Sequence, residues 1–135
     1  MTLKKKKKFD LIKIIGGKSI KAFNYKVPSD LSSSAFFIVL TALSKNSKLK
    51  IKNVNLNPSR IGVLKILKKM NVKFELRNKK IYKGENIGDI LVYSSKNLKS
   101  IKCPVSLNSA AIDEFLLIFL VAAKANGVSY FKGLS

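Results

Sequence analysis

The sequence predicts an α/β (α+β) domain in which helices pack against sheets. Hydrophobic residues make up 47% of the 135 residues, so the chain is long and apolar enough to bury a core. Two segments, 31–43 and 112–125, are apolar nearly all round, which is typical of buried helices. Shorter segments in which apolar residues alternate with lysine indicate half-exposed strands. Helices and strands therefore follow one another along the chain, as in a layered α/β domain.

The amino-terminal end is basic. Residues 4–8 are five consecutive lysines, and we expect residues 1–10 to form a basic tail. The segment after the lysines is interrupted by Asp10 and Lys13, so it contains no apolar signal core. This argues against secretion and membrane insertion, and we expect a cytoplasmic protein with no membrane partner.

Residues 11–26 are predicted to form a strand or hairpin. Segments 11–15 and 19–25 have an extended pattern. Gly16-Gly17 lies between them and would provide the hairpin turn.

Two helices are predicted in the first half of the chain. The first covers 31–44, and Ser29 or Asp30 can cap its exposed amides. The second covers 59–70 and is amphipathic, with Asn71 in the position of a left-handed C-cap. The apolar stripe of this second helix consists of Val63, Ile66, Leu67 and Met70.

A third helix and several strands complete the prediction. The helix covers 112–126 and is closed by Gly127. Strands are predicted over 48–54, 72–77, 80–82, 90–93, 101–103 and 128–132.

The net charge of +20 comes mainly from lysine, because only Arg60 and Arg77 among the 27 basic residues are arginines. Proteins that recognise nucleic acids favour arginine for bidentate contacts. The lysines are scattered over every segment, which favours a solvated basic surface around an ordinary fold. A basic α/β module that binds nucleic acid is the alternative, and nonspecific attraction of polyanions is expected at low salt.

The composition excludes several kinds of catalytic site. The chain has no histidine, so histidine general bases and Ser–His or Cys–His pairs are excluded within it. Cys103 is the single cysteine, so no internal disulfide can form and no zinc-binding spacing occurs. No metal site is predicted.

Four short motifs occur in order along the chain. They are VPSDLSSSAFF at 27–37, NPSR at 57–60, IDE at 112–114 and AAKANG at 122–127. Together they resemble the 5-enolpyruvylshikimate-3-phosphate synthase family, over about residues 12–135. The chain departs from the usual family motifs at Ser29, where glycine is common. It also departs from them at Ala110 and Ala111, where many members have proline and arginine. These departures affect the expected loop geometry.

The resemblance implies both a fold and a reaction. The fold consists of inside-out repeats of βαβαββ units with buried helices and outer sheets, here incomplete. Residues 27–135 would be a partial enolpyruvyl-transferase domain, which residues 11–26 enter from the neighbouring domain. The reaction transfers the enolpyruvyl group of phosphoenolpyruvate to the 5-hydroxyl of shikimate 3-phosphate and releases phosphate, in chorismate and aromatic amino-acid biosynthesis.

The same resemblance bears on cofactors and partners. It implies no metal or organic cofactor, no specific nucleic acid and a monomeric full enzyme, of which this chain would be a fragment that is inactive alone. Within the family, the UDP-N-acetylglucosamine enolpyruvyl transferases share the fold and are the alternative. They usually carry a reactive loop cysteine in the other domain, and nothing in this chain matches it.

Asp113 is the candidate catalytic and substrate-binding residue. By resemblance it matches the family aspartate that contacts the shikimate ring hydroxyls and serves as the proposed base. Without the resemblance, it would be interpreted as a carboxylate that caps the helix start. Glu114 points about 100° away around the helix and is interpreted as structural. Arg60 is interpreted as a surface or interdomain cation, and serines 32–34 as small residues that allow close helix packing.

Overall fold

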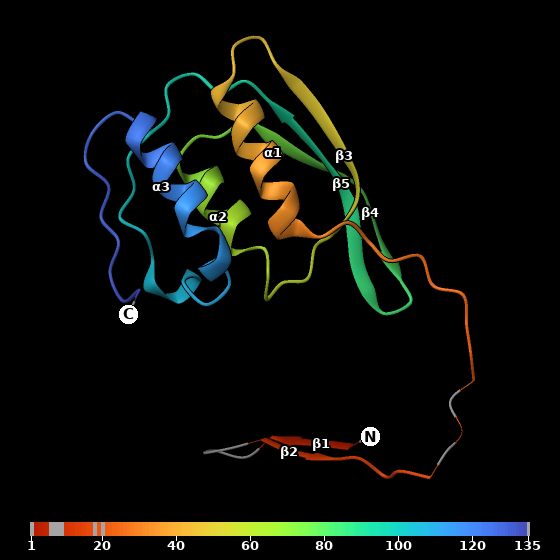
Figure 1. Ribbon diagram of the computed structural model, residues 1–135. Coiled ribbons are helices and arrows are strands. Elements are labelled where there is room, and N and C mark those ends of the chain that lie inside the picture. Colours follow the sequence, from red (N-terminus) through yellow and green to blue (C-terminus); the bar gives the residue numbers. More distant parts are fainter. Residues whose placement is uncertain (1, 6–9, 18, 20, 135) are drawn as a thin grey trace.

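The computed structural model describes residues 2–5, 10–17, 19 and 21–134. Three α-helices lie on one side of a three-stranded antiparallel sheet with strand order β3-β5-β4 (Figure 1). The helices are α1 (Leu31–Leu43), α2 (Gly62–Lys69) and α3 (Phe115–Lys124). The strands of the sheet are β3 (Lys48–Asn55), β4 (Phe74–Tyr82) and β5 (Glu85–Tyr93). This arrangement confirms the predicted fold class.

A parallel bridge adds the segment before α1 to the edge of this sheet. Ser29 pairs with Val54, since its amide donates to the Asn53 carbonyl and its carbonyl accepts from the Asn55 amide. Ser29, α1, β3, α2, β4 and β5 thus form one βαβαββ unit. The segments on either side of α3 also pair in parallel, through Lys102 and Tyr130. The chain therefore contains one complete repeat and the beginning of a second.

The helix ends follow from local chemistry. Asp30 caps α1, because its carboxylate accepts from the Ser33 amide at 2.7 Å. Helix α2 begins at Gly62 rather than at the predicted residue 59, because Pro58 and the residues after it form turns. Asn71 has a φ of 66°, which confirms the predicted left-handed position after α2. A short 3₁₀ turn, Ile112–Glu114, precedes α3.

The predicted amino-terminal hairpin is wrong in its pairing. β2 (Asp10–Lys13) pairs with β1 (Thr2–Lys5), and not with residues after Gly16-Gly17. Of the segment 19–25, the described residues form no strand. The register sets Leu3 opposite Ile12, so each strand supplies the backbone partners of the other. This hairpin lies apart from the rest of the chain (Figure 1). The lysines at 6–8 lie outside the described residues.

Three other predicted strands also differ. Residues 80–82 continue β4 beyond a bulge instead of turning back as a partner strand. Segments 101–103 and 128–132 pair only through one isolated bridge, between Lys102 and Tyr130. Their pairing is parallel and non-local, so sequence alternation alone does not determine its extent.

The linker that precedes Ser29 is attached to the tip of the β4–β5 hairpin. The ammonium group of Lys83 lies over the rings of Phe23, Tyr25 and Tyr82, at 5.3, 5.8 and 5.9 Å from their centroids. The backbone amide of Lys26 donates to the hydroxyl of Tyr82 at 3.2 Å. We call these contacts the Lys83 clasp.

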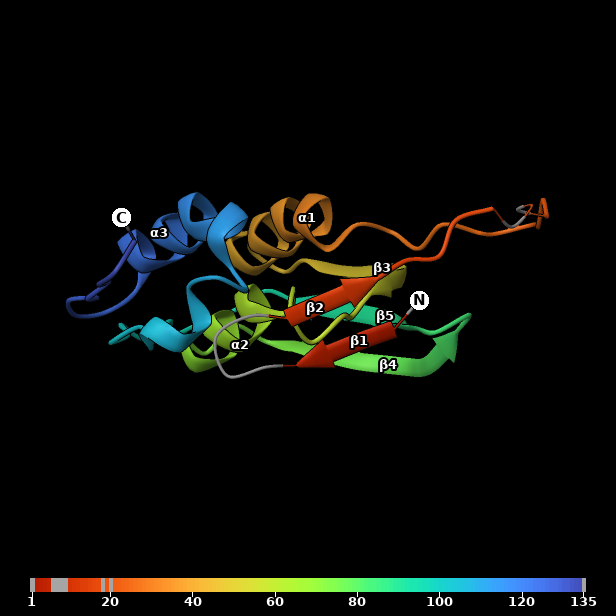
Figure 2. The ribbon, with the colours of Figure 1, turned by 90° about the horizontal axis from the view of Figure 1, so that it is seen from below.

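The core lies between the helices and the sheet. The predicted stripe of α2 is confirmed, because Val63, Ile66, Leu67 and Met70 are completely buried. Helices α1 and α3 lie side by side in an outer layer (Figure 2), and each also carries exposed apolar side chains. These side chains, the outer apolar set, are Phe36, Phe37, Leu40, Leu116, Phe119 and Leu120. Within the described residues, no helix is long and apolar enough to cross a membrane.

Candidate active site

Asp113 lies in the 3₁₀ turn that leads into α3, with a side chain that is 56% exposed. Its Oδ2 atom accepts a hydrogen bond from Nη2 of Arg60 at 3.3 Å, and the two side chains form an ion pair. These residues are 53 positions apart in the sequence. The fold therefore joins the second and third motifs at Asp113, the candidate that the family resemblance selects.

The first motif reaches the same place through Ser32. The Nη2 atom of Arg60 also donates to Oγ of Ser32 at 3.2 Å. The Ser32 hydroxyl donates in turn to Oε1 of Glu114 at 2.5 Å. Ser32, Arg60, Asp113 and Glu114 form what we call the polar cluster.

The neighbouring carboxylates of the polar cluster have different environments. Glu114 is 3% exposed and binds Ser32, whereas Asp113 is open to solvent and binds Arg60. Their side chains diverge, as expected for adjacent residues at a helix start. Asp113 is therefore accessible to a substrate, while Glu114 is an internal anchor.

The loop that carries Arg60 has a defined turn. The Arg60 amide donates to the Asn57 carbonyl at 2.8 Å. The side-chain oxygen of Asn57 accepts from both the amide and the hydroxyl of Ser59, which is an Asx-turn. Asn57 thus fixes the path of the chain just before Arg60.

Gly62 fastens this turn to the loop before Asp113. Its amide donates to the Ala110 carbonyl at 3.0 Å. A Cβ atom at Gly62 would lie 2.5 Å from the carbonyl carbon and oxygen of Ala110, which is too close for any side chain. Glycine is therefore required for the two loops of the polar cluster to approach each other.

Asn108 secures the same loop from the other side. Its buried side-chain amide donates to the carbonyls of Lys132 and Gly133, at 2.8 and 2.7 Å. Its own carbonyl accepts from the Ala111 amide at 3.1 Å. Sequence reasoning missed Asn108, because a lone asparagine in a loop has no distinguishing pattern.

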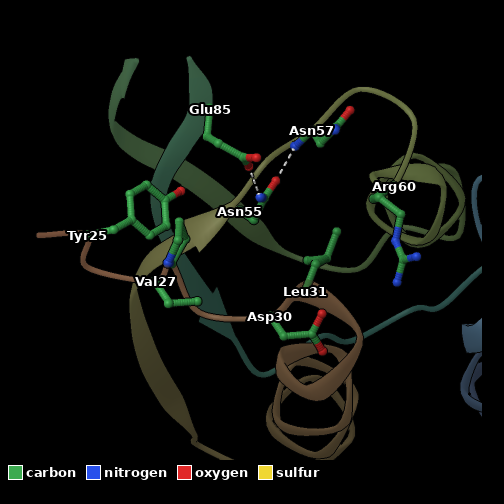
Figure 3. A pocket seen from close by; sticks show the side chains of 9 residues that line it. Tyr25, Val27, Asp30, Leu31, Asn55, Asn57, Arg60 and Glu85 are labelled. Atoms are coloured by element: carbon green, nitrogen blue, oxygen red, sulfur yellow. Dashed lines mark hydrogen bonds between the residues drawn. The ribbon is translucent and has the colours of Figure 1, made fainter. Parts of the chain in front are cut away.

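A cavity of about 520 Å³ lies beside Arg60 (Figure 3). Its lining carries charges of both signs, from Arg60, Asp30 and Glu85. The backbone hydrogen bond from Ser33 is the main reason that the pKa of Asp30 is below its usual value. Asp30 therefore serves as the N-cap of α1. The cavity is lined by Tyr25, Val27, Pro28, Asp30, Leu31, Asn55, Asn57, Arg60 and Glu85.

The prediction that serines 32–34 allow close helix packing is confirmed for Ser34 but not for Ser32. Ser34 is buried in α1, in agreement with the packing interpretation. Ser32 instead belongs to the polar cluster, a role that was missed because its partner Glu114 is 82 residues away. Among the described residues, no group of three or more histidine, cysteine, aspartate or glutamate side chains could hold a metal ion.

Comparisons with known proteins give the family. The model of the family "EPSP synthase (3-phosphoshikimate 1-carboxyvinyltransferase)" matches residues 2–135. The 3-phosphoshikimate 1-carboxyvinyltransferase of Hydrogenovibrio crunogenus is 43% identical over 122 residues, which is 90% of this chain and 27% of that protein. The enzyme of the same name from Leptospira interrogans serovar Lai is 45% identical over 103 residues, which is 76% of this chain and 23% of that protein.

A solved structure agrees with the sequence relatives. EPSP synthase from Acinetobacter baumannii superposes with a TM-score of 0.80 at 37% sequence identity, covering 95% of this chain and 29% of that one. The chain thus spans about a quarter of the length of the relatives it matches. Sequence and structure lead to the same conclusion: the chain belongs to the EPSP synthase (3-phosphoshikimate 1-carboxyvinyltransferase) family.

Proposed function

We propose that this chain is part of an enzyme that transfers the enolpyruvyl group of phosphoenolpyruvate to the 5-hydroxyl of shikimate 3-phosphate. Residues 27–135 would form part of the carboxy-terminal domain, which residues 11–26 enter from the neighbouring domain. The family match supports this function over a nucleic-acid-binding module. The relatives named 3-phosphoshikimate 1-carboxyvinyltransferase support it over a UDP-N-acetylglucosamine enolpyruvyl transferase.

Asp113 carries the chemistry in this proposal. The reaction needs a proton removed from the attacking ring hydroxyl, and a carboxylate within hydrogen-bonding distance can accept it. The observation that supports Asp113 is its position: an exposed carboxylate at the entrance of α3, held by an arginine from a second motif. Asp113 would also bind the substrate, because the ring hydroxyl must donate to it.

Both substrates are anions, so the remaining task is electrostatic. Cationic groups that clamp phosphate and carboxylate would stabilise the developing charge, and the chain itself carries a net charge of +20. Three-quarters of the length of the relatives lies outside this chain, and we expect further clamping groups from there. The full enzyme would be a cytoplasmic monomer that needs no metal or organic cofactor.

A hybrid enzyme tests the function. Residues 27–134 would replace the corresponding segment of the Acinetobacter baumannii EPSP synthase, and phosphate release from phosphoenolpyruvate and shikimate 3-phosphate would be measured. We expect turnover in the hybrid and a loss of about 10²–10⁴-fold in Asp113→Asn. The control is Glu75→Gln, an exposed carboxylate on β4 that should leave the rate unchanged. An Asp113→Asn hybrid that retains the hybrid's own rate would remove Asp113 from the mechanism.

A further inference from the structure

Arg60 is placed to determine where the carboxylate of Asp113 lies. Within the described residues, Arg60 is the only side chain that donates a hydrogen bond to Asp113. Asp113 is more than half exposed, and an exposed carboxylate with no partner samples several rotamers. A proton acceptor misplaced by about 1 Å can lose about 10²-fold in rate. The contact from Arg60 therefore has a catalytic consequence that a surface ion pair does not usually have.

The direction of the hydrogen bonds shows that Arg60 is itself held. A hydroxyl has one proton to donate and two lone pairs that accept. The proton of Ser32 goes to Glu114, so the lone pairs of Ser32 are available to Arg60. Glu114 is buried and cannot turn away to solvent. The order of the bonds, from Arg60 to Ser32 to Glu114, therefore anchors the same Nη2 atom that donates to Asp113.

The backbone supports the same geometry. Arg60 lies in the turn closed by Asn57, and Gly62 hydrogen-bonds Ala110 in the loop that leads to Asp113. The two residues of the ion pair thus project from loops that are fastened to each other. A planar guanidinium in a fixed frame presents its donors in fixed directions.

We propose that Arg60 is a positioning residue that holds the carboxylate of Asp113 in the orientation needed to accept the hydroxyl proton, and that Ser32 and Glu114 fix Arg60 for this role. The proposal rests on the proposed function. In this proposal, the NPSR motif at 57–60 contributes to turnover and not to the affinity for the substrates. Arg60 acts through Asp113, so its effect must depend on the presence of the Asp113 carboxylate.

A double-mutant cycle in the hybrid enzyme tests this dependence. We expect Arg60→Gln to lower kcat by about 10–100-fold while the KM for shikimate 3-phosphate changes less than about 3-fold. In the Asp113→Asn background, the same substitution should lower kcat by less than about 2-fold. Arg60→Lys should restore part of the rate, because its ammonium can still donate to Asp113. Ser32→Ala should lower kcat in the hybrid but not in the Arg60→Gln variant.

Arg77→Ala is the matched control. Arg77 is the other arginine of the chain, it is equally exposed, and it pairs with Glu75 on β4. It should leave kcat and KM unchanged. Thermal unfolding of every variant, followed by circular dichroism, checks that the fold is retained. If Arg60→Gln fails this check, Arg60→Lys with the same cycle replaces it.

Two results would overturn the proposal. An Arg60→Gln hybrid with unchanged kcat would show that Asp113 needs no positioning by Arg60. An equal loss in the Asp113→Asn background would show that Arg60 acts on the substrates directly. Failure of the proposed function is a different result, since the unsubstituted hybrid would then release no phosphate from phosphoenolpyruvate and shikimate 3-phosphate.

Discussion

Asn53 and Asn78, on the two outer strands of the sheet, both donate to the carboxylate of Asp89 on the central strand. The backbone nitrogen of Asn53 lies 3.0 Å from Oδ1 of Asp89, and the side-chain nitrogen of Asn78 lies 2.7 Å from Oδ2. Both asparagines have positive φ, 52° and 50°, and lie where the register of β3 and of β4 shifts. Lys50 adds an ion pair at 2.9 Å. One carboxylate thus stabilises two bulges, one on each side of β5.

Because of Asp89, the free energy of unfolding should depend on pH in the acid range. The hydrogen bond from the Asn53 amide, followed by those from Asn78 and Lys50, holds the pKa of Asp89 far below its usual value. A lowered folded-state pKa contributes stability above the unfolded pKa of about 3.9, and this contribution is lost as the pH falls below that value. We therefore expect the urea concentration at the unfolding midpoint of the hybrid enzyme to decrease as the pH is lowered through this acid range.

Asp89→Asn should lower the urea concentration at the unfolding midpoint at pH 7. It should also make this midpoint depend less on pH in the acid range. The new amide group would face the donors of Lys50 and Asn78. A midpoint with the same acid dependence in both proteins would show that Asp89 is not the responsible group.

Gly62→Ala should damage the candidate site through the backbone. The added methyl group would lie 2.5 Å from the Ala110 carbonyl, so the loop leading to Asp113 must move. We expect a loss of about 1–3 kcal/mol in the free energy of unfolding, together with a reduced kcat. Denaturant titration and the phosphate-release assay measure the two effects. Lys65→Ala, on the exposed face of α2, is the control. Parental stability in Gly62→Ala would contradict the close approach.

The chain by itself should self-associate. The outer apolar set leaves six large side chains of α1 and α3 in water. We expect aggregation in light scattering and sedimentation, and a larger monomer fraction in the double variant Phe36→Lys, Leu116→Lys. Ile81→Lys is the matched control, because Ile81 is 75% exposed on β4, outside this set. A monodisperse, cooperatively melting wild-type monomer would contradict the expectation.

The chain alone should also have no measurable transferase activity. Asp113 supplies one carboxylate, and we expect most groups that hold two anionic substrates to lie in the rest of the enzyme. Phosphate release by the purified 135-residue chain, at the protein concentration at which the hybrid enzyme is active, is the measurement. Turnover that disappears in Asp113→Asn would disprove the prediction.

Local pattern was enough to predict the three helices and strand β3, but only the first part of β4 and the last part of β5. The stripe of α2 and the left-handed Asn71 follow from spacing and residue type, and both are observed. The bulges at Asn53 and Asn78 were not predictable, because they depend on Asp89 on a third strand. The alternation of apolar and polar residues ends at Arg77, so the pattern does not show that residues 80–82 continue the same strand.

The candidate site was predictable only in part. Family resemblance selected Asp113, whose role as base stays a prediction. The surrounding contacts are tertiary: Ser32 meets Glu114 and Arg60 meets Asp113 across 82 and 53 residues. Such contacts depend on how the loops fold against one another, which here requires a glycine at position 62.

The Lys83 clasp has a consequence for movement. It attaches the linker near Tyr25 to the hairpin tip, and the bridge at Ser29 attaches it again to β3. Between these two attachments, the linker must move together with the sheet as one rigid unit. Any rotation of the amino-terminal hairpin relative to the sheet can then use Gly16 and Gly17 as its pivot, because a Cβ atom at either position would have no neighbour within 4 Å.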